Sequence, residues 1–173
     1  VLNTAQTDTL PSLKDLRMNN QYDVIFEIYD EFSGVDISAW SQYITSVIKK
    51  HEIIQTQLVL DAACGTGRLT SVLADAFDMI GLDISYGMLS AARERCPMNI
   101  LLLNQDMRDF ELYGTVGATV CCLDSINYLL DESDVRKVFS LVHNYLDPDG
   151  IFIFDVNGKM KFNLRRPEIF LAV

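Results

Sequence analysis

Residues 58–70, LVLDAACGTGRLT, constrain the fold of this chain more than any other stretch. An apolar run ends on Asp61, a tight turn containing Gly65 and Gly67 follows, and a helical pattern begins directly after it. This order predicts a strand, a loop that contacts a ligand, and a helix. Glycine suits such a loop because a backbone that passes close beneath a ligand leaves no room for a Cβ, and we expect positive φ in the turn. The N–H groups at the start of the helix would then face an anionic group of the ligand.

The spacing of the glycines separates the known kinds of nucleotide-binding loop. The phosphate-binding loop of nucleoside triphosphatases has a lysine after its last glycine, and no lysine follows Gly67. A dinucleotide-binding loop has the pattern Gly-x-Gly-x-x-Gly, but its third position is Thr70 here. The first kind of loop is therefore excluded. The interpretation as a dinucleotide-binding loop is weakened, but it stays open as an alternative.

Composition limits the class of protein. The 173 residues are 49% apolar and 22% charged, which suits one globular domain with a substantial core. The net charge of −10 argues against a surface built for nucleic acid or an anionic membrane and favours a small-molecule or protein substrate. The four cysteines lack Cys-x-x-Cys spacing, so we expect buried free thiols in a reducing cytosol. Because the sequence shows neither a membrane-spanning apolar run nor a signal-peptide core, we expect a soluble, cytoplasmic protein.

The region before the first strand is expected to be helical. Residues 1–17 are polar and lack clear periodicity, so we interpret them as an N-terminal arm or leader ahead of a domain that spans 18–173. Apolar residues at helical spacing predict helices over 22–32 and 36–54. The predicted domain then consists of a helical lid, a core and a tail, at 18–57, 58–156 and 157–173.

Strands and helices are expected to alternate after the glycine loop. Apolar runs predict four further strands, at 78–83, 100–103, 118–123 and 151–156. Between them we expect one helix capped by Ser85 and another capped by Ser133, the second ending at the turn 146–150. Five such strands joined by right-handed crossovers make a doubly wound, mainly parallel, Rossmann-like α/β sheet with helices on both faces. A ligand would then bind at the carboxyl ends of the strands.

Four motifs follow one another in the order seen in a known family. They are Asp-x-x-Cys-Gly-Thr-Gly at 61–67, Gly-Leu-Asp-Ile-Ser-x-x-Met-Leu-x-x-Ala-Arg at 81–93, Gln-Asp-Met-Arg-Asp-Phe at 105–110 and Asp-Ser-Ile-Asn-Tyr-Leu at 124–129. With these motifs the chain resembles the class I S-adenosylmethionine-dependent methyltransferases that act on small molecules. Ala63 stands where the family often has its first glycine.

The resemblance implies S-adenosylmethionine as the cofactor and assigns residues to its site. In the glycine turn the expected cofactor-binding residues are Ala63, Cys64, Gly65, Thr66 and Gly67. Asp83 would accept hydrogen bonds from the ribose hydroxyls, while Ile84 and Met88 would cover the adenine faces. Asp106 would accept from the exocyclic amine of adenine, and the Met107 N–H would donate to a ring nitrogen.

The loop after the fourth predicted strand is where cofactor and substrate meet in this family. The resemblance implies that Asp124 and Asn127 position the methionine moiety or the nucleophile, and Asp124 is the one candidate for a general base. Tyr22, Tyr29 and Trp40 would close over the cofactor as part of the lid. Packing against the sheet is the alternative explanation for each of these aromatic residues.

The implied reaction is in-line transfer of the sulfonium methyl group to an O, N or C nucleophile of a small-molecule acceptor. Three other functions stay open: a nicotinamide-dependent oxidoreductase, a domain that binds S-adenosylmethionine without turnover, and a structural fragment that binds neither cofactor. The two histidines lie apart in the sequence and give no support to Ser-His-Asp chemistry. We expect no metal site, because no cluster of His, Cys and carboxylate residues has metal-ligand spacing.

The end of the sequence departs from the family pattern. The complete fold of this family has two more strands after the fifth, and 157–173 is too short to hold both. The hydrophobic fifth strand would then be a free sheet edge, which invites association. We expect this edge to be covered by the tail 160–173 or by a second copy in a homodimer, unless the sequence is a truncated piece of a longer chain.

Overall fold

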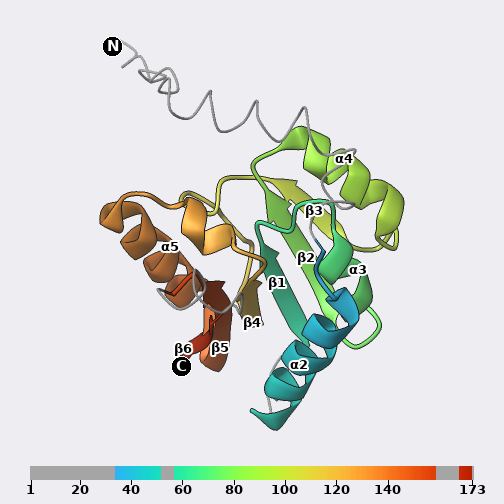
Figure 1. Cartoon of the computed structure of the whole chain (residues 1–173), viewed down its shortest axis with the longest axis horizontal. Helices are drawn as coiled ribbons and strands as arrows, with labels where there is room; N and C mark the ends of the chain where they lie inside the picture. Colours follow the sequence, from blue (N-terminus) through green and yellow to red (C-terminus); the bar gives the residue numbers. More distant parts are fainter. Residues whose placement is uncertain (1–33, 52–56, 159–167, 173) are drawn as a thin grey trace, which may run out of the picture.

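The computed structural model describes residues 34–51, 57–158 and 168–172 (Figure 1). Its elements, in chain order, are α2 (Ile37–Lys50), β1 (Leu58–Ala62), α3 (Arg68–Leu73), β2 (Asp78–Asp83), α4 (Tyr86–Arg95), β3 (Leu101–Asn104), β4 (Val116–Cys121), the 3-10 helix η1 (Ser125–Tyr128), α5 (Glu132–Tyr145), β5 (Leu146–Val156) and β6 (Glu168–Ala172). The predicted arm at 1–17 and the predicted helix at 22–32 lie outside the described residues.

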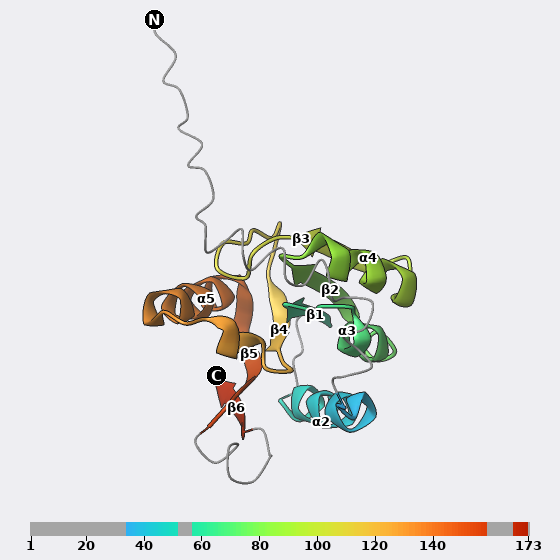
Figure 2. The same ribbon diagram turned by 45° about the horizontal axis from the view of Figure 1, so that its top comes forward.

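In the described part of the chain, six strands form one sheet in the order β3-β2-β1-β4-β5-β6. The first five strands run parallel to their neighbours, and β6 runs antiparallel to β5. The helices α2 and α3 pack on one face of the sheet and α5 on the other (Figure 2). The predicted doubly wound α/β architecture is therefore confirmed. β1 and β4 are neighbours at the centre of the sheet. The crossover that follows β1 lies on one face of the sheet, and the crossover that follows β4 lies on the other.

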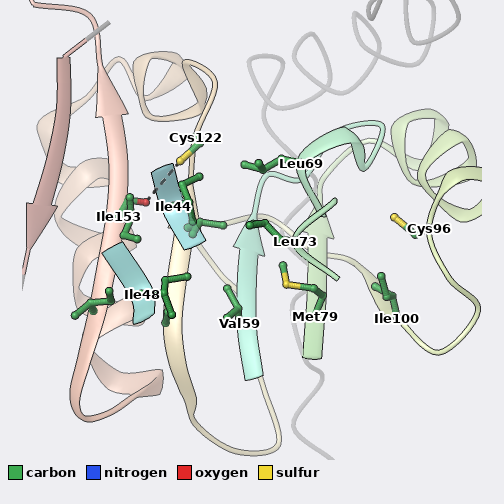
Figure 3. Packing of buried hydrophobic residues seen from close by; sticks show 13 residues of the cluster. Ile44, Ile48, Val59, Leu69, Leu73, Met79, Cys96, Ile100, Cys122 and Ile153 are labelled. Carbon is green, nitrogen blue, oxygen red and sulfur yellow. Dashed lines mark hydrogen bonds between the residues drawn. The ribbon is translucent and has the colours of Figure 1, made fainter. Parts of the chain in front are cut away.

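Successive residues of the central strands point into two different cores. Val59 packs in the cluster beneath α2 and α3, whereas Leu60 packs in the cluster beneath α5, and both side chains are buried. Figure 3 shows Ile44 and Ile48 of α2 in the first cluster, together with Leu73 of α3. Burying an aliphatic side chain of this size stabilises a fold by about 1.5–3 kcal/mol. This two-sided burial explains the continuous apolar runs in the sequence.

The boundaries of α5 and β5 differ from the predicted ones. The backbone N–H groups of Asp134 and Val135 both donate to the Asp131 carbonyl, at 3.0 and 3.3 Å, so the helix begins at Glu132 and the predicted cap Ser133 lies inside its first turn. β5 begins immediately after α5 and is longer than the predicted 151–156, because its first residues pair with the start of β4 before a register shift. The prediction was right at Ser85, whose side chain caps α4 by accepting from the Met88 N–H at 3.2 Å.

The tail of the sequence contributes one strand to the sheet. β6 pairs with β5 from Phe152 opposite Ala172 to Val156 opposite Glu168. Of the expected ways to cover the edge of β5, pairing with the tail is the one that the structure shows. The expectation that the closing part of the sheet is absent is wrong for this one antiparallel strand. A homodimer through this edge stays a prediction, and β5 itself is not a free edge.

The described residues contain neither a membrane-spanning helix nor a cluster of metal ligands. None of the helices there is long and apolar enough to cross a bilayer. Among the same residues, no group of three or more His, Cys, Asp or Glu side chains is arranged to hold a metal ion.

Candidate functional site

A cleft opens at the carboxyl ends of the parallel strands. Its lining residues are Ala63, Gly65, Leu82, Asp83, Ile84, Met88, Asp106, Met107, Arg108, Leu123, Ser125, Tyr128 and Leu129. They come from the turn after β1, the end of β2, the start of α4, and the loops after β3 and β4. The cleft thus lies where β1 and β4 send their crossovers to opposite faces, which is the usual ligand site of a doubly wound sheet.

The turn after β1 has a left-handed backbone at three positions, with φ of 64° at Ala63, 55° at Gly65 and 72° at Gly67. Its hydrogen bonds fix this shape, since the Gly67 N–H donates to the Cys64 carbonyl at 3.0 Å and the Cys64 N–H donates to Leu82 at 2.9 Å. The positive φ that the sequence predicts for this turn is confirmed. At Ala63 it costs about 1–2 kcal/mol, because a β-carbon crowds the following carbonyl.

The two glycines of the turn serve different purposes. A Cβ built on Gly67 would lie 2.7 Å from the Cys96 sulfur and 3.0 Å from the Ala92 Cβ, so this glycine allows α3 and α4 to pack closely. A Cβ built on Gly65 would have no protein atom within 4 Å. Because Gly65 lines the cleft, its missing side chain leaves room for a ligand rather than for another part of the protein.

Arginine side chains fix the glycine turn from outside. The Arg95 guanidinium, at the end of α4, donates to the Thr66 carbonyl at 2.7 Å and to the Thr66 hydroxyl at 2.8 Å. Arg68, the first residue of α3, donates to the Val35 carbonyl at 3.3 Å, ahead of α2. The turn is therefore held in place by residues of two other segments.

The carboxylate of Asp83 links the glycine turn to α4. One of its oxygens accepts from the Gly65 N–H and the other from the Ser85 N–H, both at 2.9 Å. Asp83 ends β2, is only 9% exposed and lines the cleft. A carboxylate oxygen accepts more than one hydrogen bond, so these bonds do not prevent Asp83 from accepting from a ligand as well.

The loop after β3 carries a paired acid and base. Both oxygens of the Asp106 carboxylate accept from the Arg108 Nε, at 3.0 and 2.9 Å, and the Arg108 backbone N–H donates to the same carboxylate at 2.8 Å. Arg108 also reaches Asp134 of α5 at 3.3 Å. Hydrogen bonds from Lys137 and Arg108 outweigh partial burial and lower the pKa of Asp134. These contacts join the loop, with Met107 on the cleft wall, to the beginning of α5.

The loop after β4 contains two successive left-handed residues, Leu123 with φ 64° and Asp124 with φ 73°. Leu123 lines the cleft together with Ser125 and Tyr128 of η1. Tyr128 is 44% exposed, which places its ring at the mouth of the cleft. Strained residues of this kind concentrate at ligand sites, where surrounding contacts hold them in place.

Burial determines the charge state of the thiols around the site. Desolvation raises the pKa of the Cys64, Cys121 and Cys122 thiols well above the usual value, and nearby carboxylates raise it further. They are therefore neutral thiols at physiological pH and poor nucleophiles. The four cysteines are free and buried, as predicted.

Comparison with known proteins decides the family. Residues 59–150 match the family described as a methyltransferase domain. The chain belongs to the class I S-adenosylmethionine-dependent methyltransferases. It is 36% identical to a putative methyltransferase, YqeM, of Bacillus subtilis over 81% of the chain and 57% of that protein. It is 32% identical to a dTDP-3-amino-3,6-dideoxy-alpha-D-glucopyranose N,N-dimethyltransferase of Streptomyces fradiae over 76% of the chain and 52% of that protein.

A solved structure agrees with this assignment. An S-adenosylmethionine-dependent methyltransferase from Clostridium acetobutylicum superimposes with a TM-score of 0.72 and 33% identity, over 84% of this chain and 61% of the other. The chain therefore spans a little more than half the length of these relatives.

The cleft of this methyltransferase brings together about half of the predicted cofactor-binding residues. Those on its lining are Ala63, Gly65, Asp83, Ile84, Met88, Asp106 and Met107. Cys64, Thr66 and Gly67 belong to the glycine turn but do not line the cleft. Their roles, like those of all the predicted site residues, stay predictions.

Other predicted residues lie elsewhere. Asp124 and Asn127 are in the loop after β4 but are not among the residues that line the cleft. The Asp124 N–H donates to Asp155 of β5, and the Asn127 side-chain oxygen accepts from the Asn157 N–H. Tyr22 and Tyr29 lie outside the described residues. Trp40 packs against the core cluster beneath α2 and α3, which agrees with the packing explanation of this residue.

Several lining residues were not predicted. They are Leu82, Arg108, Leu123, Ser125, Tyr128 and Leu129. Each lies within five residues of a position that the motifs did identify. The available signal was their place at or just beyond the carboxyl ends of three predicted strands, where every side chain on the cleft side of the sheet is a candidate.

Proposed function

We propose that this domain binds S-adenosylmethionine in the cleft and transfers its methyl group to an O, N or C nucleophile of a small-molecule acceptor. The observation that carries the proposal is the Asp83 carboxylate at the cleft rim, bonded at 2.9 Å to the N–H of the unobstructed Gly65. This pair provides an acceptor for a ribose diol beside a space without side chains.

The lining fits the separate parts of this cofactor. Ile84, Met88 and Met107 offer apolar surface for the two faces of adenine, and the Asp106 carboxylate, already oriented by Arg108, would accept from its exocyclic amine. Asp83 would accept from the ribose hydroxyls. The room left by Gly65 suits the methionine moiety, which would lie along the glycine turn.

When bound, the cofactor supplies a sulfonium methyl group that an acceptor attacks in line. The chain's own contribution is to orient and desolvate the reacting groups, and orientation alone removes about 7–11 kcal/mol from the barrier of a well-aligned reaction. Leu123 and Leu129 exclude water from the wall formed by the loop after β4. No general base is required by this geometry. Asp124 stays the proposed base for an acceptor that must lose a proton, with the Asn127 amide 3.4 Å from its Oδ1.

The acceptor that best fits the relatives is an amine. The Streptomyces fradiae relative, 32% identical, is named as a dimethyltransferase of a dTDP-linked amino sugar. In this chain Ser125 and the half-exposed Tyr128 give the cleft mouth a hydroxyl and an aromatic face, the kind of surface that sugars contact. We therefore propose an amino sugar as the first acceptor to test. The buried free thiols suit the reducing cytoplasm as the compartment.

Calorimetric titration with S-adenosylmethionine, its demethylated product S-adenosylhomocysteine and NAD tests the cofactor. We expect the first two to bind and NAD not to bind. Binding of NAD alone would replace the proposal with an oxidoreductase. Incubation with S-adenosylmethionine and a panel of amino sugars, followed by measurement of S-adenosylhomocysteine, then tests transfer. Binding without any product would leave a cofactor-binding domain that does not catalyse transfer to these acceptors.

A further inference from the structure

The turn that follows β4 is held in an unfavourable backbone conformation. Leu123 and Asp124 are both left-handed, and neither is glycine. A β-carbon at each position crowds the neighbouring carbonyl, so this turn persists only where other groups hold it. The turn also determines the shape of the cleft, because it places Leu123 on the wall and leads directly into η1.

The group that holds the turn is a buried carboxylate on the neighbouring strand. The Asp124 N–H donates to the carboxylate of Asp155 on β5, at 3.1 Å to Oδ2 and 3.3 Å to Oδ1. Asp155 is 1% exposed. It follows Phe154, which pairs with Cys121 at the end of β4, so its side chain reaches the turn from the adjacent strand. A charge-assisted hydrogen bond in such a dry place is stronger than one between neutral groups.

A second contact ties the same loop to the end of β5. The Asn127 side-chain amide donates to the Asp124 carbonyl at 3.2 Å, and its oxygen accepts from the Asn157 N–H at 2.8 Å. The loop after β4 is thus attached to β5 at two points. These contacts turn the Asp124 N–H and the Asn127 side-chain oxygen toward β5 and Asn157, while Leu123 and Tyr128 line the cleft.

We propose that Asp155 is a positioning residue of the cleft, whose carboxylate holds the left-handed turn at Leu123 and Asp124 so that Leu123 and η1 face the ligand. Asp155 acts through the turn and does not itself line the cleft. The effect on ligand binding rests on the proposed function, whereas the effect on the turn does not.

The first experiment compares Asp155→Asn with the matched control Asp149→Asn. Asp149 lies near the opposite end of β5, is exposed and has φ 65°, which asparagine tolerates. Hydrogen–deuterium exchange of the protein without ligand should be faster for Asp155→Asn in the peptide covering 122–130, with peptides from β1 and β2 unchanged. The dissociation constant for S-adenosylmethionine should rise by about tenfold or more, because the amide oxygen of asparagine is a weaker acceptor than a carboxylate and holds the turn less firmly. The control should match the wild type in both measurements.

The second experiment adds Asp124→Gly to Asp155→Asn. Glycine adopts the left-handed conformation without strain, so the turn should no longer need the carboxylate. The double variant should bind S-adenosylmethionine with the same affinity as Asp124→Gly alone. Its backbone amides in 122–130 should also exchange as slowly as those of Asp124→Gly alone. If Asp155→Asn does not fold, the double variant should recover folding.

Three results would overturn the proposal. The first is that Asp155→Asn has the amide exchange and the affinity of the wild type. The second is a loss of affinity in Asp155→Asn that the added Asp124→Gly does not reverse. The third is that Asp155→Asn does not fold and the double variant does not fold either. If the wild type does not bind S-adenosylmethionine, the proposed function fails, and the exchange measurements still decide whether Asp155 holds the turn.

Discussion

The hydroxyl of Thr70, on α3, donates a 2.6 Å hydrogen bond to the buried carboxylate of Asp61, on β1, across the glycine turn. Burial raises the pKa of Asp61 to about 7, the Thr70 hydrogen bond lowers it, and the charge of nearby Asp83 raises it again. Burial therefore outweighs the hydrogen bond. β1, the strand that leads into the glycine turn, therefore carries a carboxyl group, that of Asp61, with a pKa of about 7.

Replacing Asp61 should change how stability depends on pH. Its folded pKa of about 7 lies above the ordinary value of 3.8, so between these values the folded protein keeps a proton that the unfolded chain loses. The stability due to protonated Asp61 is complete below about pH 4 and is lost as the pH rises to about 7, by about 1.4 kcal/mol per pH unit. Urea unfolding should therefore show Asp61→Asn gaining about 3 kcal/mol relative to the wild type between pH 5 and pH 8.

The matched control for this experiment is Asp78→Asn, at the exposed first position of β2. Its stability should follow the wild type at both pH values. Parallel pH curves for Asp61→Asn and the wild type would show that Asp61 does not carry a raised pKa.

Ala63→Gly should stabilise the protein. Ala63 has φ 64°, and removing its Cβ relieves about 1–2 kcal/mol of strain, part of which is offset by the greater freedom of glycine in the unfolded chain. We expect a net gain of up to about 1 kcal/mol in the free energy of unfolding, measured with urea. Ala62→Gly is the control, because Ala62 lies in β1 with ordinary backbone angles and should lose stability. A loss of equal size in both variants would contradict the argument.

Alanine at the two glycines of the turn should have opposite main effects. Gly67→Ala places its Cβ 2.7 Å from the Cys96 sulfur at positive φ, so we expect a loss of about 2–4 kcal/mol in stability. Gly65→Ala adds backbone strain alone, about 1–2 kcal/mol, but its Cβ enters the cleft. Thermal unfolding should show that Gly67→Ala is the less stable of the two variants. Calorimetry with S-adenosylmethionine should show that Gly65→Ala, although more stable, binds the cofactor more weakly. Equal affinity in Gly65→Ala and the wild type would show that the ligand does not use this space.

Asp83→Ala should weaken cofactor binding. It removes the acceptor proposed for the ribose and the group that holds the Gly65 N–H, so calorimetry should show a loss of about 1–3 kcal/mol in binding free energy for S-adenosylmethionine. Asp75→Ala, at an exposed position just after α3, is the control and should bind as the wild type does. Unchanged affinity in Asp83→Ala would remove Asp83 from the site.

Local sequence patterns were enough to predict the centre of the fold. The apolar run to Asp61, the glycines of the turn and the Ser85 cap each act within a few residues, and the structure has β1, the left-handed turn and α4 where these patterns place them. The carboxylate of Asp83 could be predicted at the cleft rim because it ends a strand in a parallel sheet.

The rest of the cleft depends on contacts between distant residues. The Asp124 N–H and the Asn127 side-chain oxygen bond to Asp155 and Asn157, which lie 31 and 30 residues further along the chain. No sequence pattern near Asp124 predicts its left-handed backbone. Two successive residues other than glycine, here Leu123 and Asp124, are seldom both left-handed. The register of β6 likewise depends on β5, whose residues 152–156 pair with 168–172.

Thr119→Val should stabilise the protein. Thr119 lies in the middle of β4, fully buried, and its hydroxyl has no hydrogen-bond partner among the residues that the structure describes. A buried unsatisfied hydroxyl costs about 1–3 kcal/mol, and valine has nearly the same shape, so we expect a gain of about 1 kcal/mol in urea unfolding. Thr70→Val makes the same chemical change at a buried threonine whose hydroxyl is bonded to Asp61, and it should lose stability by a similar amount. If both substitutions destabilise, the Thr119 hydroxyl has a partner, such as a buried water molecule, and its desolvation is already compensated.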